Sequence, residues 1–280
     1  MPDRRTHRGP HPEDARLFDT AIQPMLRAAA EDFCWLLSHG YPHDSTLKLV
    51  GDRYELAARQ RMAVSRCCCS EAQAARRQSC RLETEQLAGA ALWLDGYNVL
   101  TTIEAALAGG VILAARDGTY RDMASMHGSY RRVAETVPAL ELLGQMLASH
   151  RVATCHWLLD RPVSNSGRLK GIMEQLALAR GWPWQVELVA NPDALLAEAT
   201  PQSAEPEPSP SRPGVVVVSA DSAILDRCAA WYSLAREAVC RHIPTARIVD
   251  LSATPSAGST PLQSCVFHRK CGAGWPSSDS

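Results

Sequence analysis

Several features that would assign this protein to a class at once are missing from its sequence. Its 280 residues carry 29 basic and 30 acidic side chains, so there is no excess of positive charge with which to coat nucleic acid. No apolar run approaches the roughly 18 residues of a membrane span, and the first residues lack the apolar core of a signal peptide. We therefore expect a cytoplasmic protein in which any contact with nucleic acid comes from a local patch.

The ten cysteines lack the spacing of a disulfide framework. Cys67, Cys68 and Cys69 are adjacent, and no C-x-x-C pair occurs, which is typical of reduced thiols in an intracellular chain. One spacing near the end of the sequence fits zinc, but it has no evident fourth ligand. Whether the residues of that spacing bind a metal stays open: Cys265, His268 and Cys271.

The sequence does contain enough apolar material for a sizeable core, since 46% of its residues are hydrophobic. Residues 17–37 carry apolar side chains at helical spacing, and Gly40 and Pro42 follow as stop signals. Residues 56–75 are predicted to form a further helix, because they are rich in Ala, Gln and Arg, which are good helix formers. We predict a helical N-terminal domain over residues 15–82.

From residue 89 the pattern changes to short apolar runs that alternate with amphipathic stretches, which indicates β-α units and a parallel sheet. We predict an α/β domain over residues 89–251, Rossmann-like, with a mostly parallel sheet flanked by helices. A Pro-rich segment at about 198–213 is expected to be a disordered insertion in this domain, and residues 252–280 a flexible tail. The predicted strands cover 92–95, 111–114, 153–159, 185–189, 215–219 and 247–251, and the later helices cover 137–150, 166–180 and 223–242.

Aspartates stand at the carboxyl ends of three of these apolar runs: Asp95, Asp160 and Asp221. Because such ends converge on one edge of a parallel sheet, we expect the three carboxylates to meet in one crevice. Like charges held close together need a proton or a cation, and carboxylate oxygens suit Mg²⁺ or Mn²⁺. The sequence therefore predicts a metal site with these aspartates as ligands and catalytic groups.

Other polar residues lie where they can support such a site. We expect the Asn98 amide to orient Asp95, and Ser219 to lie beside Asp221. Asp117 and His127 follow the second predicted strand, where loops often carry function. Each has a simpler interpretation as well: Asp95-Gly96 and Asp117-Gly118 are typical turns, and a lone His is more often structural.

A Ser-, Asn- and Gly-rich segment leads from Asp160 into the next predicted helix. Free N–H groups at a helix start bind phosphate, so Ser164 and Ser166 are candidates, with Arg168 or Lys170 nearby. Either serine is equally typical of a simple helix cap. Asp226 is a further supporting candidate, although its place one and a half turns into a predicted helix also fits a solvated surface residue.

The helical domain concentrates positive charge that the overall balance hides. Residues 51–81 contain seven arginines against three acidic residues. An Arg-bearing helix face is usually a solvated surface, yet it is also the best candidate here for contact with a nucleic-acid backbone. For that role we single out Arg53, Arg59 and Arg61.

Several of these motifs resemble a known family. Leu49-Val50-Gly51-Asp52-Arg53-Tyr54 resembles the N-terminal module of the uncharacterised domain-of-unknown-function 434 family, and three later motifs look like its companion C-terminal domain: Asp95-Gly96-Tyr97-Asn98, Asp160 to Gly167, and Ser219-Ala220-Asp221. That second domain is similar to the PIN and NYN nuclease superfamily, whose members hold Mg²⁺ or Mn²⁺ with strand-end acidic residues and hydrolyse RNA. The resemblance implies Glu104 as the counterpart of a further acidic residue that many PIN nucleases use.

Two hypotheses follow. The first is a metal-dependent nuclease that hydrolyses phosphodiesters, RNA rather than DNA, with Asp95, Asp160 and Asp221 as ligands of Mg²⁺ or Mn²⁺. The alternative is a non-catalytic PIN-like module that binds nucleic acid or a phosphorylated ligand. Retained aspartates without turnover would distinguish the second from the first.

Overall fold

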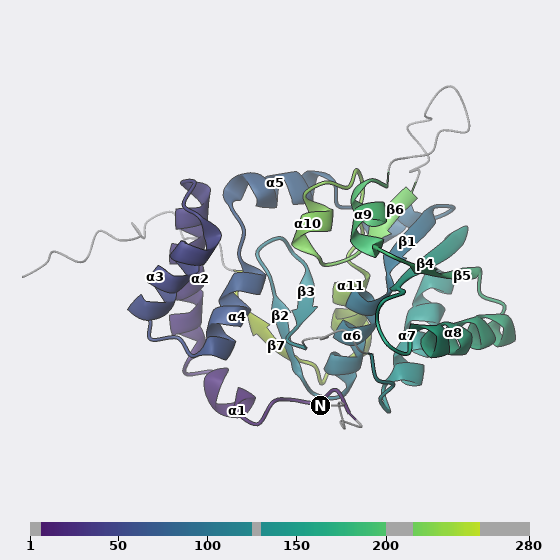
Figure 1. Ribbon diagram of the computed structural model, residues 1–280, viewed down its shortest axis with the longest axis horizontal. Coiled ribbons are helices and arrows are strands. Elements are labelled where there is room, and N and C mark those ends of the chain that lie inside the picture. The colour runs from purple at the N-terminus through teal and green to yellow at the C-terminus, as the bar shows by residue number, and fades with distance from the viewer. Residues whose placement is uncertain (1–6, 125–129, 200–214, 253–280) are drawn as a thin grey trace, which may run out of the picture.

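The computed structural model describes residues 7–124, 130–199 and 215–252. Its helical region lies on the left of Figure 1, and a parallel sheet with its helices lies on the right. We call α1 to η1 the helical region; its elements are α1 Asp14–Leu17, α2 Gln23–Ser38, α3 His43–Arg53, α4 Ala58–Cys67, α5 Glu71–Ser79 and η1 Thr84–Leu87.

Local signals in the sequence explain where these helices begin. Pro24 lies in the first turn of α2, where its missing N–H costs nothing. Ser70 and Gln73 form a capping box at α5: the Gln73 backbone N–H donates to Ser70 Oγ (3.2 Å), and the Ser70 N–H donates to Gln73 Oε1 (3.0 Å). The continuous helix expected over residues 56–75 is therefore wrong, because extended residues before this cap divide it into α4 and α5.

The second part of the chain alternates strands and helices, as predicted. Six predicted strands are present, each within about two residues of its expected ends, and α8 has the predicted bounds. The elements are β1 Ala91–Asp95, α6 Gly96–Leu107, β2 Val111–Ala114, β3 Tyr120–Asp122, α7 Thr136–Ser149, β4 Thr154–Asp160, α8 Ser166–Arg180, β5 Trp184–Val189, α9 Pro192–Ala197, β6 Val215–Val218, α10 Ser222–Leu225, α11 Leu234–His242 and β7 Arg247–Asp250.

The strands form two sheets instead of the single sheet that we expected. Four strands in the order β5-β4-β1-β6 are all parallel, which confirms an α/β domain with a parallel sheet flanked by helices. A second sheet has the order β3-β2-β7, with β2 and β3 antiparallel. The short β3 was not predicted.

The continuous helix predicted over residues 223–242 is also wrong, since it is divided into α10 and α11. Between them the Trp231 N–H donates to the Cys80 carbonyl (3.0 Å), and the Leu82 N–H donates to the Trp231 carbonyl (2.8 Å). The adjacent Tyr232 N–H donates to the Val217 carbonyl (2.8 Å). Strand-like pairing with residues distant in the sequence thus replaces helical hydrogen bonds that the local pattern favours.

The chain leaves two neighbouring strands of the four-stranded sheet toward opposite faces. Buried side chains of α6, α7, α8 and α11 pack on one face, whereas those of α9 and α10 pack on the other. The chain leaves β1 into α6 and leaves β6 into α10. The topological switch point therefore lies between the carboxyl ends of β1 and β6, which is where ligands bind in open α/β sheets.

The helical region packs against the three-stranded sheet. Leu26 and Phe33 of α2 and Val64 of α4 share one buried cluster with Leu113 of β2 and Val249 of β7. The two predicted domains are therefore joined by a common core. Among the described residues, no helix has the length and apolar character that a membrane crossing requires.

Candidate functional site

Asp95 ends β1 and lies at the switch point. Its carboxylate is buried, with 7% of the residue exposed. Ser219, which follows β6, donates from Oγ to Asp95 Oδ2 (2.8 Å), and the Asn98 backbone N–H donates to Oδ1 (3.4 Å). The first of these hydrogen bonds joins the ends of β1 and β6 directly.

Gly96 allows the chain to turn from β1 into α6 at this point. A Cβ at residue 96 would lie 2.8 Å from the Leu158 carbonyl oxygen and 2.5 Å from the Leu159 side chain. Both neighbours belong to β4, which is paired with β1. Residue 96 must therefore be glycine, because β4 approaches the backbone there too closely for a side chain. The same turn holds Asp95 at the end of β1.

The Asn98 side chain does not orient Asp95 as expected, but binds the backbone of the loop after β6. Its side-chain Oδ1 accepts a hydrogen bond from the Ala220 N–H (3.0 Å), so the amide binds the loop after β6. The Asn98 backbone, and not its amide, contacts Asp95. Ser219 completes this connection, because its Oγ accepts from the Asp221 N–H (3.0 Å) while it donates to Asp95.

The environment of Asp95 opposes its ionisation. Burial raises the pKa of its carboxyl, the hydrogen bond from Ser219 lowers it in part, and the negative charges of Asp193 and Asp221 raise it further, to about 7. An aspartate with this pKa stays protonated at pH values at which an exposed aspartate is ionised, unless a positive charge is nearby. Perturbed carboxyls of this kind cluster at functional sites.

Three further aspartates lie on the same side of the sheet: Asp193 and Asp221 act on Asp95, and Asp160 acts on Asp193. We call these four residues the carboxylate edge. Asp221 caps α10 through Oδ1, which accepts from the N–H groups of Ala223 (2.8 Å) and Ile224 (3.3 Å). Burial raises the pKa of Asp160 at the end of β4. Burial and then the charges of Asp221 and Asp160 raise the pKa of Asp193 in α9. These charges lie close enough to influence one another.

The sequence interpretation did not include Asp193. It stands four residues after the end of β5, in Asn191-Pro192-Asp193, and is therefore a further acidic residue that follows a strand. The intervening Pro192 begins α9, which was also not predicted. Reading every strand end in the same way would have found it.

The carboxylate edge does not form a ready-made three-ligand metal centre. Within residues 7–124, 130–199 and 215–252, no three His, Cys, Asp or Glu side chains are grouped so that they could hold a metal ion. The predicted convergence of Asp95, Asp160 and Asp221 on one ion is thus not present as such. Mg²⁺ is commonly held by only one or two carboxylates, with water and substrate phosphates as its other ligands.

A cavity of about 580 Å³ reaches this edge at Asp221, the one aspartate of the four that lines it. One wall comes from the α/β part and includes Asn98, Asp221 and Ser222, and the opposite wall comes from the helical region. The helical wall is mostly polar and includes His43, Ser65, Arg66, Gln73 and Arg77.

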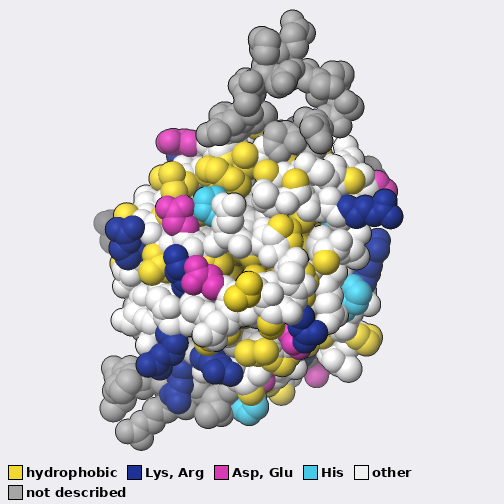
Figure 2. All heavy atoms as spheres, turned by 90° about the vertical axis from the view of Figure 1, so that its right-hand side faces the viewer, with side chains coloured by type: hydrophobic (Ala, Val, Ile, Leu, Met, Phe, Trp, Pro, Cys, Tyr) yellow, Lys and Arg dark blue, Asp and Glu magenta, His cyan; other side chains and the backbone are white. Residues whose placement is uncertain are grey.

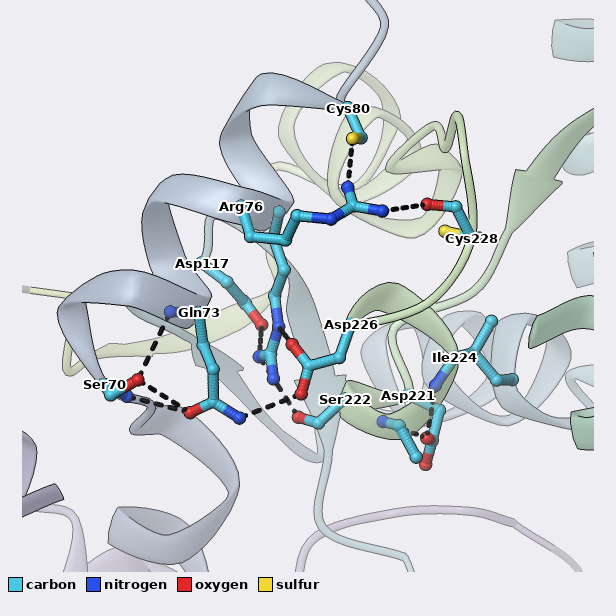
Figure 3. Close-up of polar contacts among 12 residues, drawn as sticks. Ser70, Gln73, Arg76, Cys80, Asp117, Asp221, Ser222, Ile224, Asp226 and Cys228 are labelled. Atoms are coloured by element: carbon cyan, nitrogen blue, oxygen red, sulfur yellow. Dashed lines mark hydrogen bonds and ion pairs between the residues drawn. The ribbon is translucent and has the colours of Figure 1, made fainter. Parts of the chain in front are cut away.

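Asp117, which is buried, and Asp226, which is partly exposed, belong to an ion-pair network that joins the helical region to α10 (Figure 3). Arg77 of α5 donates from Nη1 to Asp117 Oδ2 (2.6 Å) and from Nε to Asp226 Oδ1 (2.7 Å). Arg121 also pairs with Asp117 (2.6 Å). Burial raises the pKa of Asp117, but Arg121, Thr119 and Arg77 outweigh it, so the pKa is lowered. Both predicted supporting residues therefore anchor Arg77.

At the start of α8, the Ser166 side chain is not free to bind phosphate, whereas Ser164 and Arg168 are exposed. Ser166 is buried, and its Oγ lies 2.6 Å from each of the Asp160 and Val163 carbonyl oxygens and from Tyr97 Oη. Its hydroxyl is thus used within the fold. The Ser164 carbonyl accepts from the Tyr130 N–H (3.2 Å), Lys170 pairs with Glu174 (3.5 Å), and Arg168 is exposed.

The three arginines proposed for backbone contact pair within the helical region. Arg59 donates to both carboxylate oxygens of Asp14 (2.5 and 3.0 Å), and Arg61 donates to Asp52 (2.9 Å). Arg53 lies 3.4 Å from Asp32 and over the Tyr54 ring. Each of the three thus pairs with an aspartate of the helical region, which the composition of the sequence could not show.

Glu104 does not extend the carboxylate edge. It is fully buried two turns along α6, where Arg8 Nε and the hydroxyls of Tyr130 and Thr136 donate to it at 2.5–2.6 Å. Its role is to hold the N-terminal segment against α6. The remaining predicted residues and segments lie outside the described part of the chain: His127, Cys265, His268 and Cys271, most of the 198–213 insertion, and the tail after residue 252.

Comparison with known proteins extends the resemblance found in the sequence. The family model described as Domain of unknown function (DUF5616) matches residues 84–237, and that described as Protein of unknown function (DUF434) matches residues 25–79. The uncharacterized protein MJ0935 of Methanocaldococcus jannaschii is 30% identical over 152 residues, which cover 54% of this chain and 73% of the relative. No solved structure matches the chain.

Proposed function

The chain belongs to the family described as Domain of unknown function (DUF5616), and we propose that it is a divalent-cation-dependent phosphodiesterase that hydrolyses nucleic acid. The observation that carries the proposal is the Ser219–Asp95 hydrogen bond across the switch point. It places a buried carboxyl, whose pKa is raised to about 7, where an open α/β sheet binds its ligand.

The donor set fits Mg²⁺ or Mn²⁺. The edge offers only oxygen donors, and a nearby cation would offset the burial and the like charges that oppose ionisation of Asp95. Asp95 would hold the cation, with Asp221 beside it, while Asp160 and Asp193 would position its water. When bound, such an ion lowers the pKa of a water molecule and stabilises charge on phosphoryl oxygens.

The residues around the edge have defined roles in this proposal. Ser219 keeps the Asp95 carboxylate aimed across the switch point, and Asn98 holds the Ala220 backbone beside it. The adjoining cavity has a volume in the range of about 300–1,000 Å³ that is usual for ligand sites. A part of the substrate would lie there, between Asp221 and the helical region.

We propose nucleic acid as the substrate, and RNA rather than DNA, because the strand-end aspartates resemble those of PIN and NYN nucleases. Figure 2 shows the side of the molecule that bears α7, α8 and β5, where acidic and basic side chains are interspersed with hydrophobic ones. Such a surface fits the near-zero net charge. Substrate contact would therefore be local to the cavity and would not extend over this side.

One observation favours the alternative, a non-catalytic module that binds nucleic acid or a phosphorylated ligand. In the described part of the chain the carboxylates do not form a three-ligand metal group. We would expect such loosely grouped carboxylates in a protein that has the fold and the cavity but does not bind a cation tightly. It would bind its ligand equally with or without a divalent cation.

Hydrolysis assays test the proposal. Purified protein is incubated with end-labelled single-stranded RNA, hairpin RNA and single-stranded DNA, with Mn²⁺, with Mg²⁺ and with a chelator. We expect cleavage by the wild type only with a divalent cation, none by Asp95→Asn, and wild-type cleavage by Glu13→Gln, which alters an exposed carboxylate just before α1. Binding without cleavage in every condition would support the alternative.

A further inference from the structure

The loop and short helix that carry Asp221 are held by arginines from outside the parallel sheet. Arg121 of β3 donates from Nε to the Ala220 carbonyl (2.8 Å). Arg76 of α5 donates to the Cys228 carbonyl (2.9 Å), and Arg77 donates to Asp226 at the end of α10. The segment from Ala220 to Cys228 is thus fixed at both ends.

Arg77 is the centre of this arrangement. Its guanidinium is 1% exposed and contacts Asp117, Asp226 and Ser222 Oγ (3.3 Å). The planar guanidinium of an arginine presents five donors in a fixed geometry and can orient two carboxylates, whereas the three donors of a compact ammonium group impose no such geometry. Because Ser222 is the first residue of α10 and Asp226 follows its last, Arg77 spans the whole helix that Asp221 caps.

Gln73, one turn earlier in α5, reinforces the same contact. Its Nε2 donates to Asp226 Oδ2 (2.9 Å), while its Oε1 remains in the capping box with Ser70. Figure 3 shows Gln73 and Arg76 reaching from α5 toward the α10 segment, with Asp221 at the far end of that helix. Gln73 and Arg77 also line the cavity opposite Asp221.

We propose that Arg77 is a positioning residue that sets Asp221 relative to Asp95, so that the helical region is an integral part of the site. This inference rests on the proposed function. A helix of only four residues, Ser222–Leu225, has few contacts of its own to fix its orientation. The ion pairs of Arg77 therefore fix the orientation of this helix. Ser219 links it to Asp95, because its hydroxyl accepts from the Asp221 N–H and donates to the Asp95 carboxylate.

The test compares two buried arginines in the full-length chain. Arg77→Lys keeps the charge but loses the fork. The matched control is Arg8→Lys, which weakens the buried Arg8–Glu104 pair (2.5 Å) on α6 without contacting α10. We measure thermal stability without metal, Mn²⁺ affinity by isothermal titration calorimetry, and cation-dependent cleavage of single-stranded RNA.

We expect both variants to lose stability, but only Arg77→Lys to bind Mn²⁺ roughly tenfold more weakly, as typical for a residue that orients a ligand. Equal Mn²⁺ affinities for wild type and Arg77→Lys would show a purely structural role and overturn the inference. If the wild type neither binds Mn²⁺ nor cleaves, it is the proposed function that fails.

Gln73→Glu keeps the test decisive if Arg77→Lys does not fold. Glutamate retains the capping oxygen toward Ser70 but replaces the Nε2 donor with an oxygen that repels Asp226. We expect a folded protein with weakened Mn²⁺ affinity. Wild-type Mn²⁺ affinity in this variant would overturn the inference by itself.

Discussion

Among the single residues, Asp95 is distinguished because it is both buried and close to two other negative charges. Burial is the larger cause of its raised pKa, and the charges of Asp193 and Asp221 add to it. A turn-forming aspartate in water would have neither property. The carboxyl of Asp95 therefore costs stability when it ionises, unless a cation compensates the charge.

This cost gives the first prediction, which concerns pH. Below about pH 3.8 the carboxyl is protonated in the folded and unfolded chains, and its contribution to stability is fully present. As pH rises through the folded pKa of about 7, that contribution is lost, at about 1.4 kcal/mol per pKa unit. Without divalent cations, the wild type should therefore lose stability between pH 4 and pH 8 relative to Asp95→Asn, in urea unfolding at a series of pH values. Parallel curves for the two proteins would contradict the burial argument.

A second prediction concerns Tyr97, which follows Asp95 in the same turn. Its buried hydroxyl lies 2.6 Å from Ser166 Oγ and so ties the start of α6 to the start of α8. Tyr97→Phe should lower the free energy of unfolding by about 1 kcal/mol, because Ser166 keeps its carbonyl acceptors. Tyr41→Phe, at a residue that is 54% exposed, is the control and should change nothing. A Tyr97→Phe protein as stable as the control would mean that this hydrogen bond contributes nothing.

At the scale of elements, the sequence predicted segments that depend on local signals. The positions of β1 and β6 follow from short apolar runs, and α8 ends before Gly181, which takes the left-handed conformation (φ 67°) typical of a helix stop. Long-range pairing was not visible. Trp231 divides a predicted helix because it pairs with residues 80–82 and lies beside Val217, far away in the sequence.

The turn between β1 and α6 gives a prediction at this scale. Gly96→Ala places a Cβ against the Leu158 carbonyl, so we expect a loss of about 1–3 kcal/mol and a weakened cation site, since Asp95 is adjacent. Gly171→Ala, inside α8 with no atom within 4 Å of the new Cβ, should instead stabilise by about 0.5–1 kcal/mol. Chemical denaturation of both variants checks the contrast. Equal effects would show that β4 can move away from the turn.

At the scale of the whole molecule, the helical region and the α/β part are joined by packing and by charge. The shared cluster around Leu113 and the Arg77 network both cross between them. The partners of Arg77 stand 40 and 149 residues away in the sequence. The sequence therefore indicated the strand-end aspartates but not the arginines that hold the segment from Ala220 to Cys228, since such partners follow from the fold.

This joint core predicts that the chain unfolds in one transition. Leu113→Ala should cost about 2–5 kcal/mol and lower the far-UV circular dichroism and tryptophan fluorescence midpoints together. Leu178→Ala, at a residue that is 86% exposed, is the control and should leave the midpoint near that of the wild type. Two separate transitions would mean that the helical region unfolds independently.

We propose that Asp95 is a cation-binding carboxyl at the switch point. NMR of its side-chain carboxyl carbon follows its pKa and tests this proposal. Without divalent cations we predict a value of about 7, and with saturating Mg²⁺ a value lower by about one unit or more. A pKa in the usual range for aspartate, or one that Mg²⁺ leaves unchanged, would contradict the account.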